Sequence, residues 1–274
     1  ATTSQGRYSG SAYDRDAIVG SIKRYYELIV KMVSIRPDHI TYPLEGGWGD
    51  DVIPLEKLRR LGFNDMTIDL VRHLPYVTSY RPVFPSTQTI NYFQNDFTGP
   101  DEKYQLEDPN SVGLWPLPEG RIPQGILPLS KPLGGDGLGM WWLLDTNTGE
   151  LTAHDAYISK PEEGIPEDEQ WRKARPVHAV AYFDGLCEDL ISLEMLPVPG
   201  DSNRSEWQVW QPKWMRAYQK WLDEAQEIYR KCRWPDLPRS QRQKCRKFLV
   251  EMQDRLTAEE NEKLQRRIAV ASET

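Results

Sequence analysis

The clearest periodic pattern near the start of the chain covers residues 14–33, where apolar side chains recur at spacings of three and four. This spacing places them on one side of a helix and predicts a helix over that range. Asp14 and Asp16 stand at its start, where the helix dipole favours negative charge. The side chains expected to face the core are Ile18, Ile22, Tyr25, Ile29 and Met32.

Two shorter helices are expected after an irregular, proline-rich segment. Residues 55–61 read as a short helix, and Gly62 ends it. Asn64 or Asp65 can cap a second helix that runs to residue 74, because a proline follows. The N-terminal third of the chain is therefore expected to be mainly helical.

The middle of the chain carries the patterns that are typical of strands. Residues 140–145 are apolar up to the last position, as in a central strand that is buried on both faces. A turn at 146–149 then leads to a return strand over 150–157. Further strands are expected at residues 87–93, 125–129 and 177–182.

The sequence divides into two regions, which are separated by a segment whose composition is typical of a domain boundary. The charged residues 160–173 are expected to form an exposed loop, and a helix is expected over 184–196. Residues 197–203 then combine prolines, glycine and polar residues, which is typical of a linker. This places one domain in residues 1–200 and an extension in 201–274.

The extension is expected to consist of helices. Apolar residues at four-three spacing predict one helix up to Cys232 and another after Ser240. Thr257 and Glu260 have the spacing of a capping box for a last short helix. The extension is expected to pack on the first domain or to pair with a second copy of the chain.

Four segments carry recognisable motifs: residues 125–130 (GILPLS), 134–137 (GGDG), 142–151 (WLLDTNTGEL) and 179–187 (AVAYFDGLC). Together they resemble the core of the SMI1/KNR4 (SUKH) superfamily, in particular its fungal members. They match a strand with an Ile-Pro-like motif, a glycine turn, a strand ending in Asp-x-x-Thr-Gly, and the entry into a closing helix. The match covers about a quarter of the chain.

The resemblance implies an α+β fold with a single, mostly antiparallel, curved sheet backed by helices, followed here by an all-helical C-terminal extension. Family members are known as adaptors, as immunity proteins against bacterial toxins, and as fungal regulators of cell-wall synthesis and signalling. A non-catalytic protein-interaction or regulatory domain is therefore expected, with another protein as its partner. The partner is expected near Trp48 and Asp136, and alanine at either position should weaken binding while sparing stability.

Composition narrows the class of partner and the compartment. The formal net charge of −7 argues against nucleic-acid binding, which needs a basic surface. No apolar run reaches the roughly 20 residues that span a bilayer, and residues 1–10 lack an apolar signal core. The chain has three cysteines and no Cys-x-x-Cys pair, which favours reduced thiols in the cytoplasm or the nucleus.

Candidate chemistry is sparse, and neither a cofactor nor a metal is expected. The acidic turn that begins at Asp145 lacks the spacing of a calcium loop. The glycine turn precedes a strand, so it does not fit a nucleotide-binding loop. An alternative is a hydrolase whose cleft gathers scattered residues such as His154, Asp155 and Asp136, although neighbours on a strand point to opposite faces.

Tryptophans are unusually frequent, with ten in the chain, and several lie just after the linker. Because aromatic residues are favoured in binding hot spots, Trp207 and Trp210 are candidate partner contacts, together with Trp141. A second alternative is a scaffold that acts through the Trp-rich C-terminal helices. Basic residues follow them and are expected to lie mainly on a solvated face: Arg239, Arg242, Lys244, Arg246 and Lys247.

Overall fold

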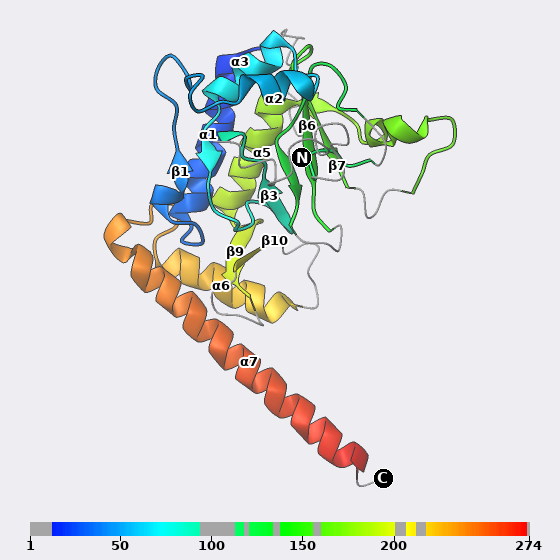
Figure 1. The fold of residues 1–274 in the computed structure, drawn as a ribbon. Helices are drawn as coiled ribbons and strands as arrows, with labels where there is room; N and C mark the ends of the chain where they lie inside the picture. The colour runs from blue at the N-terminus through cyan, green and yellow to red at the C-terminus, as the bar shows by residue number, and fades with distance from the viewer. Residues whose placement is uncertain are drawn as a thin grey trace, which may run out of the picture.

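The fold combines helices with small antiparallel sheets and ends in a long helix (Figure 1). It is a computed structural model that describes residues 13–93, 113–117, 121–133, 138–155, 160–200, 207–211 and 218–272. The mixed helix and strand content expected from the sequence is confirmed. The Gly-Gly-Asp-Gly turn and Asp136 lie outside the described residues.

The predicted N-terminal helices are confirmed. Helix α1 (Arg15–Lys31) begins after Asp14, whose carboxylate accepts a hydrogen bond from the backbone N–H of Ala17. Helix α2 (Leu55–Arg60) is followed by helix α3 (Asp65–His73). Asn64 caps α3 by accepting from the backbone N–H of Thr67. Local capping chemistry thus fixes where α1 and α3 start.

The largest sheet has four antiparallel strands in the order β4-β6-β7-β8. Strand β6 (Trp141–Asp145) is central, as its apolar sequence predicts, between β4 (Ile126–Pro128) and β7 (Glu150–His154). Strand β8 (Val177–His178) forms the edge beside β7. The register pairs Leu144 with Leu151 and Asp145 with Glu150, so a tight turn joins β6 to β7.

The expectation of a single sheet is wrong, because three further strand pairs are separate. Strand β1 (Ile40–Thr41) pairs with β2 (Tyr76–Val77), and β3 (Thr87–Thr89) pairs with β5 (Ser130–Pro132). Between β4 and β5, Leu129 donates to the carbonyl of Trp142 and accepts from the N–H of Ile90. Pro128 and Pro132 lack N–H donors, so each strand around Leu129 stays short and the ladder changes partner.

The extension is not all-helical, because β10 (Trp207–Trp210) pairs with β9 (Leu196–Pro199) across the expected linker. Trp207 and Val209 alternate with more exposed neighbours, as on a half-buried strand. Helices α6 (Gln219–Lys231) and α7 (Arg242–Ser272) follow. Thr257 lies inside α7, so the predicted capping box starts no new helix.

Two further boundaries differ from the expectations. Helix α5 (Ala179–Ser192) starts five residues earlier than predicted. Strand β8 ends just before it, where the backbone N–H of Ala179 donates to the carbonyl of Gly149. The charged loop contains a 3-10 helix, η3 (Glu167–Lys173), that buries Trp171. Two shorter 3-10 turns are η1 (Pro37–His39) and η6 (Arg239–Gln241).

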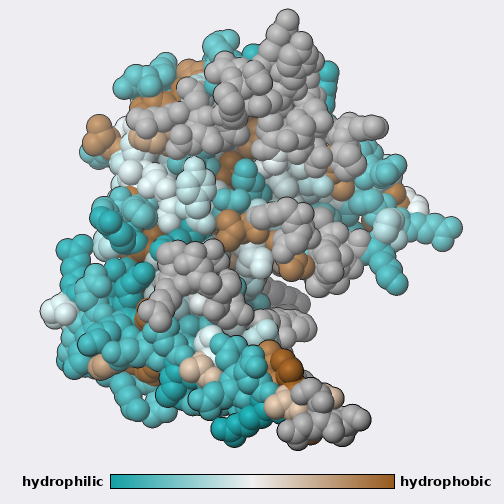
Figure 2. Space-filling view, turned by 60° about the horizontal axis from the view of Figure 1, so that its bottom comes forward, coloured by the Kyte–Doolittle hydropathy of each residue, from teal (hydrophilic) through white to brown (hydrophobic). Residues whose placement is uncertain are grey.

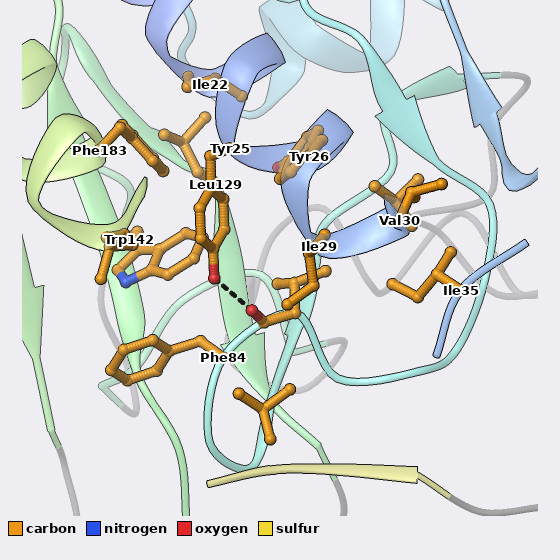
Figure 3. Close-up of a cluster of buried hydrophobic side chains, with 14 of the residues drawn as sticks. Ile22, Tyr25, Tyr26, Ile29, Val30, Ile35, Phe84, Leu129, Trp142 and Phe183 are labelled. Carbon is orange, nitrogen blue, oxygen red and sulfur yellow. Dashed lines mark hydrogen bonds between the residues drawn. The ribbon is translucent and has the colours of Figure 1, made fainter. Parts of the chain in front are cut away.

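The core lies between α1, α5 and the inner face of the four-stranded sheet (Figure 3). The Trp142 ring from β6 meets Tyr25 of α1 at 5.9 Å and Phe183 of α5 at 5.4 Å between ring centroids. Tyr25 also donates its hydroxyl hydrogen to the carbonyl of Val83. A fully buried tryptophan therefore joins both helices to the central strand.

Side chains from the C-terminal helices bind the backbone at the end of α1. The Tyr229 hydroxyl of α6 lies 2.7 Å from the carbonyl oxygen of Met32 and 2.9 Å from that of Pro197. Arg242 and Arg246 of α7 donate to the carbonyls of Val30 and Val33, both at 3.1 Å. Since the last carbonyls of a helix lack partners within it, these contacts fasten the extension to the first domain.

Tyr229→Phe should lower the free energy of unfolding by about 1–2 kcal/mol, because two buried carbonyls lose their shared hydroxyl partner. Urea denaturation followed by tryptophan fluorescence measures the change. Tyr218→Phe is the control, because the Tyr218 side chain is exposed. Equal stability of Tyr229→Phe and the unaltered chain would contradict this bonding.

Candidate interaction site

Trp48, which is half-buried, belongs to an aromatic cluster next to α3. Its indole Nε1 donates to the carbonyl of Leu74 at 2.9 Å, and its ring centroid lies 4.8 Å from that of Phe93. The Tyr76 ring lies 6.3 Å away on the neighbouring β2. Trp48 thus ties an irregular segment to the end of α3, which is a structural task.

The other two partner contacts predicted near the sheet are Asp136 and Trp141. Asp136 lies outside the described residues, so its environment is not part of the site geometry. Trp141 is 6% exposed and pairs across the ladder with His154 of β7. Its ring is therefore part of the folded interior, and a partner would meet little of it.

The two tryptophans of β10 face different surroundings. Trp207 is 3% exposed, and the guanidinium of Arg246 lies 4.8 Å from its ring centroid. Trp210 is half-buried and points toward Tyr218, with 4.9 Å between the ring centroids. Trp207 therefore docks the extension, whereas Trp210 reaches the surface.

Trp210, Tyr218 and Trp221 together form what we call the surface aromatic group. Tyr218 is 39% exposed and lies 6.3 Å from Trp221, edge to face. The indole Nε1 of Trp210 donates to the side chain of Gln208 at 2.8 Å, which holds the ring in place. The sequence does not indicate Tyr218 as a site residue, because its spacing from neighbouring apolar residues predicts helical core packing.

A second feature, not predicted from the sequence, is a hollow on the outer face of the four-stranded sheet. It has a volume of about 170 Å³, and we call it the sheet hollow. The sequence could have indicated which residues face the hollow, because side chains alternate along a strand and every second residue of β6 and β7 faces this side. The hollow is lined by Ile126, Leu143, Asp145, Glu150, Thr152, Trp171, Arg172 and Pro176.

His154 and Asp155, two residues of the hydrolase alternative, do not form a hydrogen-bonded pair. His154 is 2% exposed, and among the described residues neither of its ring nitrogens has a hydrogen-bond partner. Burial lowers the pKa of its imidazole, while Asp155 raises it and Lys173 lowers it. Because Asp155 does not hydrogen-bond to the ring, it does not orient His154 for general base catalysis.

The acidic turn and the basic patch also have structural tasks. One carboxylate oxygen of Asp145 accepts from the backbone N–H and the side-chain amide of Asn147, at 2.8 and 2.9 Å. Arg242 and Arg246 turn inward to the carbonyls near α1 and leave the expected solvated face. In the described ranges, no group of three His, Cys, Asp or Glu side chains could hold a metal ion.

His154 should make the protein lose stability as the pH falls. Its native pKa lies below the ordinary value of 6.5, so the unfolded chain binds the proton more readily between these two values. Stability then falls with decreasing pH across that window, by at most about 1.4 kcal/mol per unit. Urea denaturation of His154→Leu at pH 7 and pH 5 should show a smaller loss than the unaltered chain, and parallel losses would contradict this.

The structure changes the expected outcome of Trp48→Ala. Loss of the ring and of the Leu74 hydrogen bond should cost about 2–3 kcal/mol of unfolding free energy. Trp48→Phe, which keeps an aromatic ring, should cost less. Thermal unfolding of both variants measures the effect, and an unchanged midpoint for Trp48→Ala would contradict the structural role.

The residues and geometry of this chain are the basis for inferring its function. Comparisons with protein-family models, curated proteins and solved structures found no match. Across the described ranges, no helix has a stretch that is long and apolar enough to cross a membrane.

Proposed function

We propose that the chain is a non-catalytic protein-interaction domain of the SMI1/KNR4 type. Three observed features support this proposal, because the resemblance implies them. They are the hairpin of β6 and β7, strand β4 beside it, and helix α5 after β8. Gly149 closes the hairpin turn with a φ of 74°, a conformation that favours glycine. Gly149 thus occupies a turn position that the proposed fold needs.

The observation that carries the interaction function is the surface aromatic group. Trp210 and Trp221 are half-buried and Tyr218 is exposed, so a protein partner would cover apolar rings that water now touches. Large aromatic side chains lose little conformational entropy on binding and dominate many interfaces. The group lies at the junction of β10 and α6, where the extension joins the body.

The partner is proposed to be another protein in a reducing compartment, the cytoplasm or the nucleus. Cys187, Cys232 and Cys245 are free and buried, so they pack as small apolar side chains. Burial raises the pKa of the Cys187 thiol to about 11, which keeps it protonated and unreactive near neutral pH.

A scaffold role for the C-terminal helices is the second candidate, and the outer half of α7 favours it. Residues 260–271 are exposed throughout, and the apolar Leu264 and Ile268 are about half exposed on adjacent turns. Figure 2 shows a mainly hydrophilic surface over this end of the molecule, with apolar atoms near the tip of the projecting helix. In a homo-oligomer of this kind, the outer half of α7 would pair with the same helix of a second copy of the chain.

The double variant Trp210→Ala/Tyr218→Ala should weaken capture of the partner by about tenfold or more, because hot-spot aromatics each contribute over 1 kcal/mol. Affinity purification with the tagged chain, followed by mass spectrometry, identifies the partner. Surface plasmon resonance then measures the affinity.

Tyr42→Ala/Tyr80→Ala, which removes two exposed tyrosines elsewhere, is the matched control and should leave affinity unchanged. Full affinity of the Trp210→Ala/Tyr218→Ala variant would contradict the proposed surface. A chain shortened before the outer half of α7 that loses the partner would favour the scaffold role instead.

A further inference from the structure

The turn that joins α6 to α7 carries a large positive charge. Residues 230–247 contain eight lysines and arginines and a single acidic residue, Asp236, so their formal net charge is +7. The whole chain has a net charge of −7, which means that the remainder of the chain is strongly acidic. We call residues 230–247 the basic corner.

The cations of the basic corner have two different tasks. Arg242 and Arg246 donate to the carbonyls of Val30 and Val33, which holds the corner against the end of α1. The other six cationic residues are exposed: Arg230, Lys231, Arg233, Arg239, Lys244 and Lys247. The corner is therefore fastened to the body while most of its charge faces the surroundings.

Carboxylates of the chain neutralise only part of this charge. Lys231 lies 2.8 Å from Glu227, and Lys247 lies 3.7 Å from Glu251, each pair one helical turn apart. An excess of positive charge favours an acidic group from outside. Within the described part of the chain, four exposed cations have no carboxylate at ion-pair distance: Arg230, Arg233, Arg239 and Lys244.

The start of α7 adds to the same preference. The N-terminus of a helix carries a partial positive charge, which favours acidic side chains. The first turn of α7 contains no acidic residue and instead includes Arg242 and Lys244. The dipole and the side chains thus act together to attract carboxylates.

The same chain contains a segment of matching composition, residues 161–170 (PEEGIPEDEQ), which we call the acidic loop. It has five acidic side chains and no lysine or arginine, so its formal net charge is −5. Within the described residues, Glu169 is the one of the five that forms an ion pair, with Arg172 at 3.5 Å. All five are exposed: Glu162, Glu163, Glu167, Asp168 and Glu169.

Hydrogen bonds from one side chain hold the acidic loop in shape. The Oε1 of Gln170 accepts from the backbone N–H of Glu162 at 2.8 Å, and its Nε2 donates to the carbonyl of Ile165 at 2.7 Å. The next residue, Trp171, is buried and anchors the end of the loop. Because the loop is ordered before it binds, association costs less conformational entropy.

The basic corner and the acidic loop lie far apart in one molecule. Figure 1 shows the turn between α6 and α7 on one side of the molecule, and the loop that leads into η3 on the opposite side. Helices α1 and α5 and the four-stranded sheet lie between them. The two charged surfaces can therefore meet only when they belong to different copies of the chain.

We propose that copies of the chain bind one another head to tail, with the acidic loop of one copy against the basic corner of the next. The exposed cations of the corner pair with the carboxylates of the loop. This inference goes beyond the proposed function. It uses neither the surface aromatic group nor the outer half of α7.

The form of the assembly follows from the two surfaces. The contact joins different surfaces, so it is heterologous and leads to rings or open chains of copies. Exposed ion pairs are individually weak and are screened by salt. Association is therefore expected to be weak, to grow with concentration, and to be strongest at low salt.

Sedimentation velocity of the full chain tests this contact. At low salt, the weight-average sedimentation coefficient should rise steadily with protein concentration. In about 0.5 M salt, which screens charges beyond a few ångström, it should return to the value of a single chain. A single-chain value at every concentration up to the millimolar range would overturn the proposal.

Charge reversal shows whether these two surfaces meet. Glu162→Lys/Glu167→Lys in the loop, or Arg239→Glu/Lys244→Glu in the corner, should each weaken association about tenfold or more. The variant that combines all four changes has the net charge of the unaltered chain, and it should associate again because both surfaces have exchanged sign. Association that survives either reversal, or that the combination does not restore, would overturn the proposal.

Two further variants separate other causes of association. Glu188→Lys/Glu194→Lys is the matched control, because it reverses two exposed carboxylates outside the acidic loop and should leave association unchanged. Leu264→Gln/Ile268→Gln should also associate normally. Loss of association in that variant would place the contact on the outer half of α7 and overturn the proposal.

Thermal unfolding checks that every variant is folded. A loop-reversed chain that no longer associates, and that still binds the captured partner with full affinity, supports the head-to-tail contact. The same result leaves the proposed interaction function standing, because that function depends on the surface aromatic group.

Discussion

The bonds between the C-terminal helices and the end of α1 hold the two regions of the chain together. Tyr229, Arg242 and Arg246 reach carbonyls in the last turn of α1 and just after it, where few helical partners are left. Val33 lies there with a φ of 73°, which is unfavourable for a β-branched residue, so the chain turn depends on outside support. Two cationic side chains at a helix C-terminus also complement its dipole. The N-terminal helix and the extension therefore form one packed unit.

From α1 the packing continues into the sheet through Trp142. One side of β6 is occupied by this ring and its aromatic neighbours, which makes the inner face a continuous core. The outer face carries alternating residues that pack less completely and leave the sheet hollow under Trp171. Because side chains alternate along a strand, the residues of β6 that build the core differ from those that line the hollow.

Much of the fold could be predicted from the sequence, because local chemistry decides it. The caps at Asp14 and Asn64 and the apolar run of β6 each specify an element within a few residues. The separate strand pairs, the pairing of β10 with β9, and the single long α7 depend on contacts between distant residues, which no local pattern encodes. The same limit applies to the site. Trp207 and Trp210 have the same residue type and strand, yet one lies under Arg246 and the other reaches Tyr218.

The outer half of α7 extends the reach of the molecule. Residues 260–271 amount to about 18 Å of helix at 1.5 Å per residue, and contacts such as the ion pair of Glu259 with Lys220 hold their base on the body. A ligand held near the tip would remain tethered close to the rest of the surface, where any additional weak contact becomes an intramolecular event at high effective concentration. The outer half of α7 would thereby allow two weak contacts to combine into a strong overall affinity, without enlarging either contact.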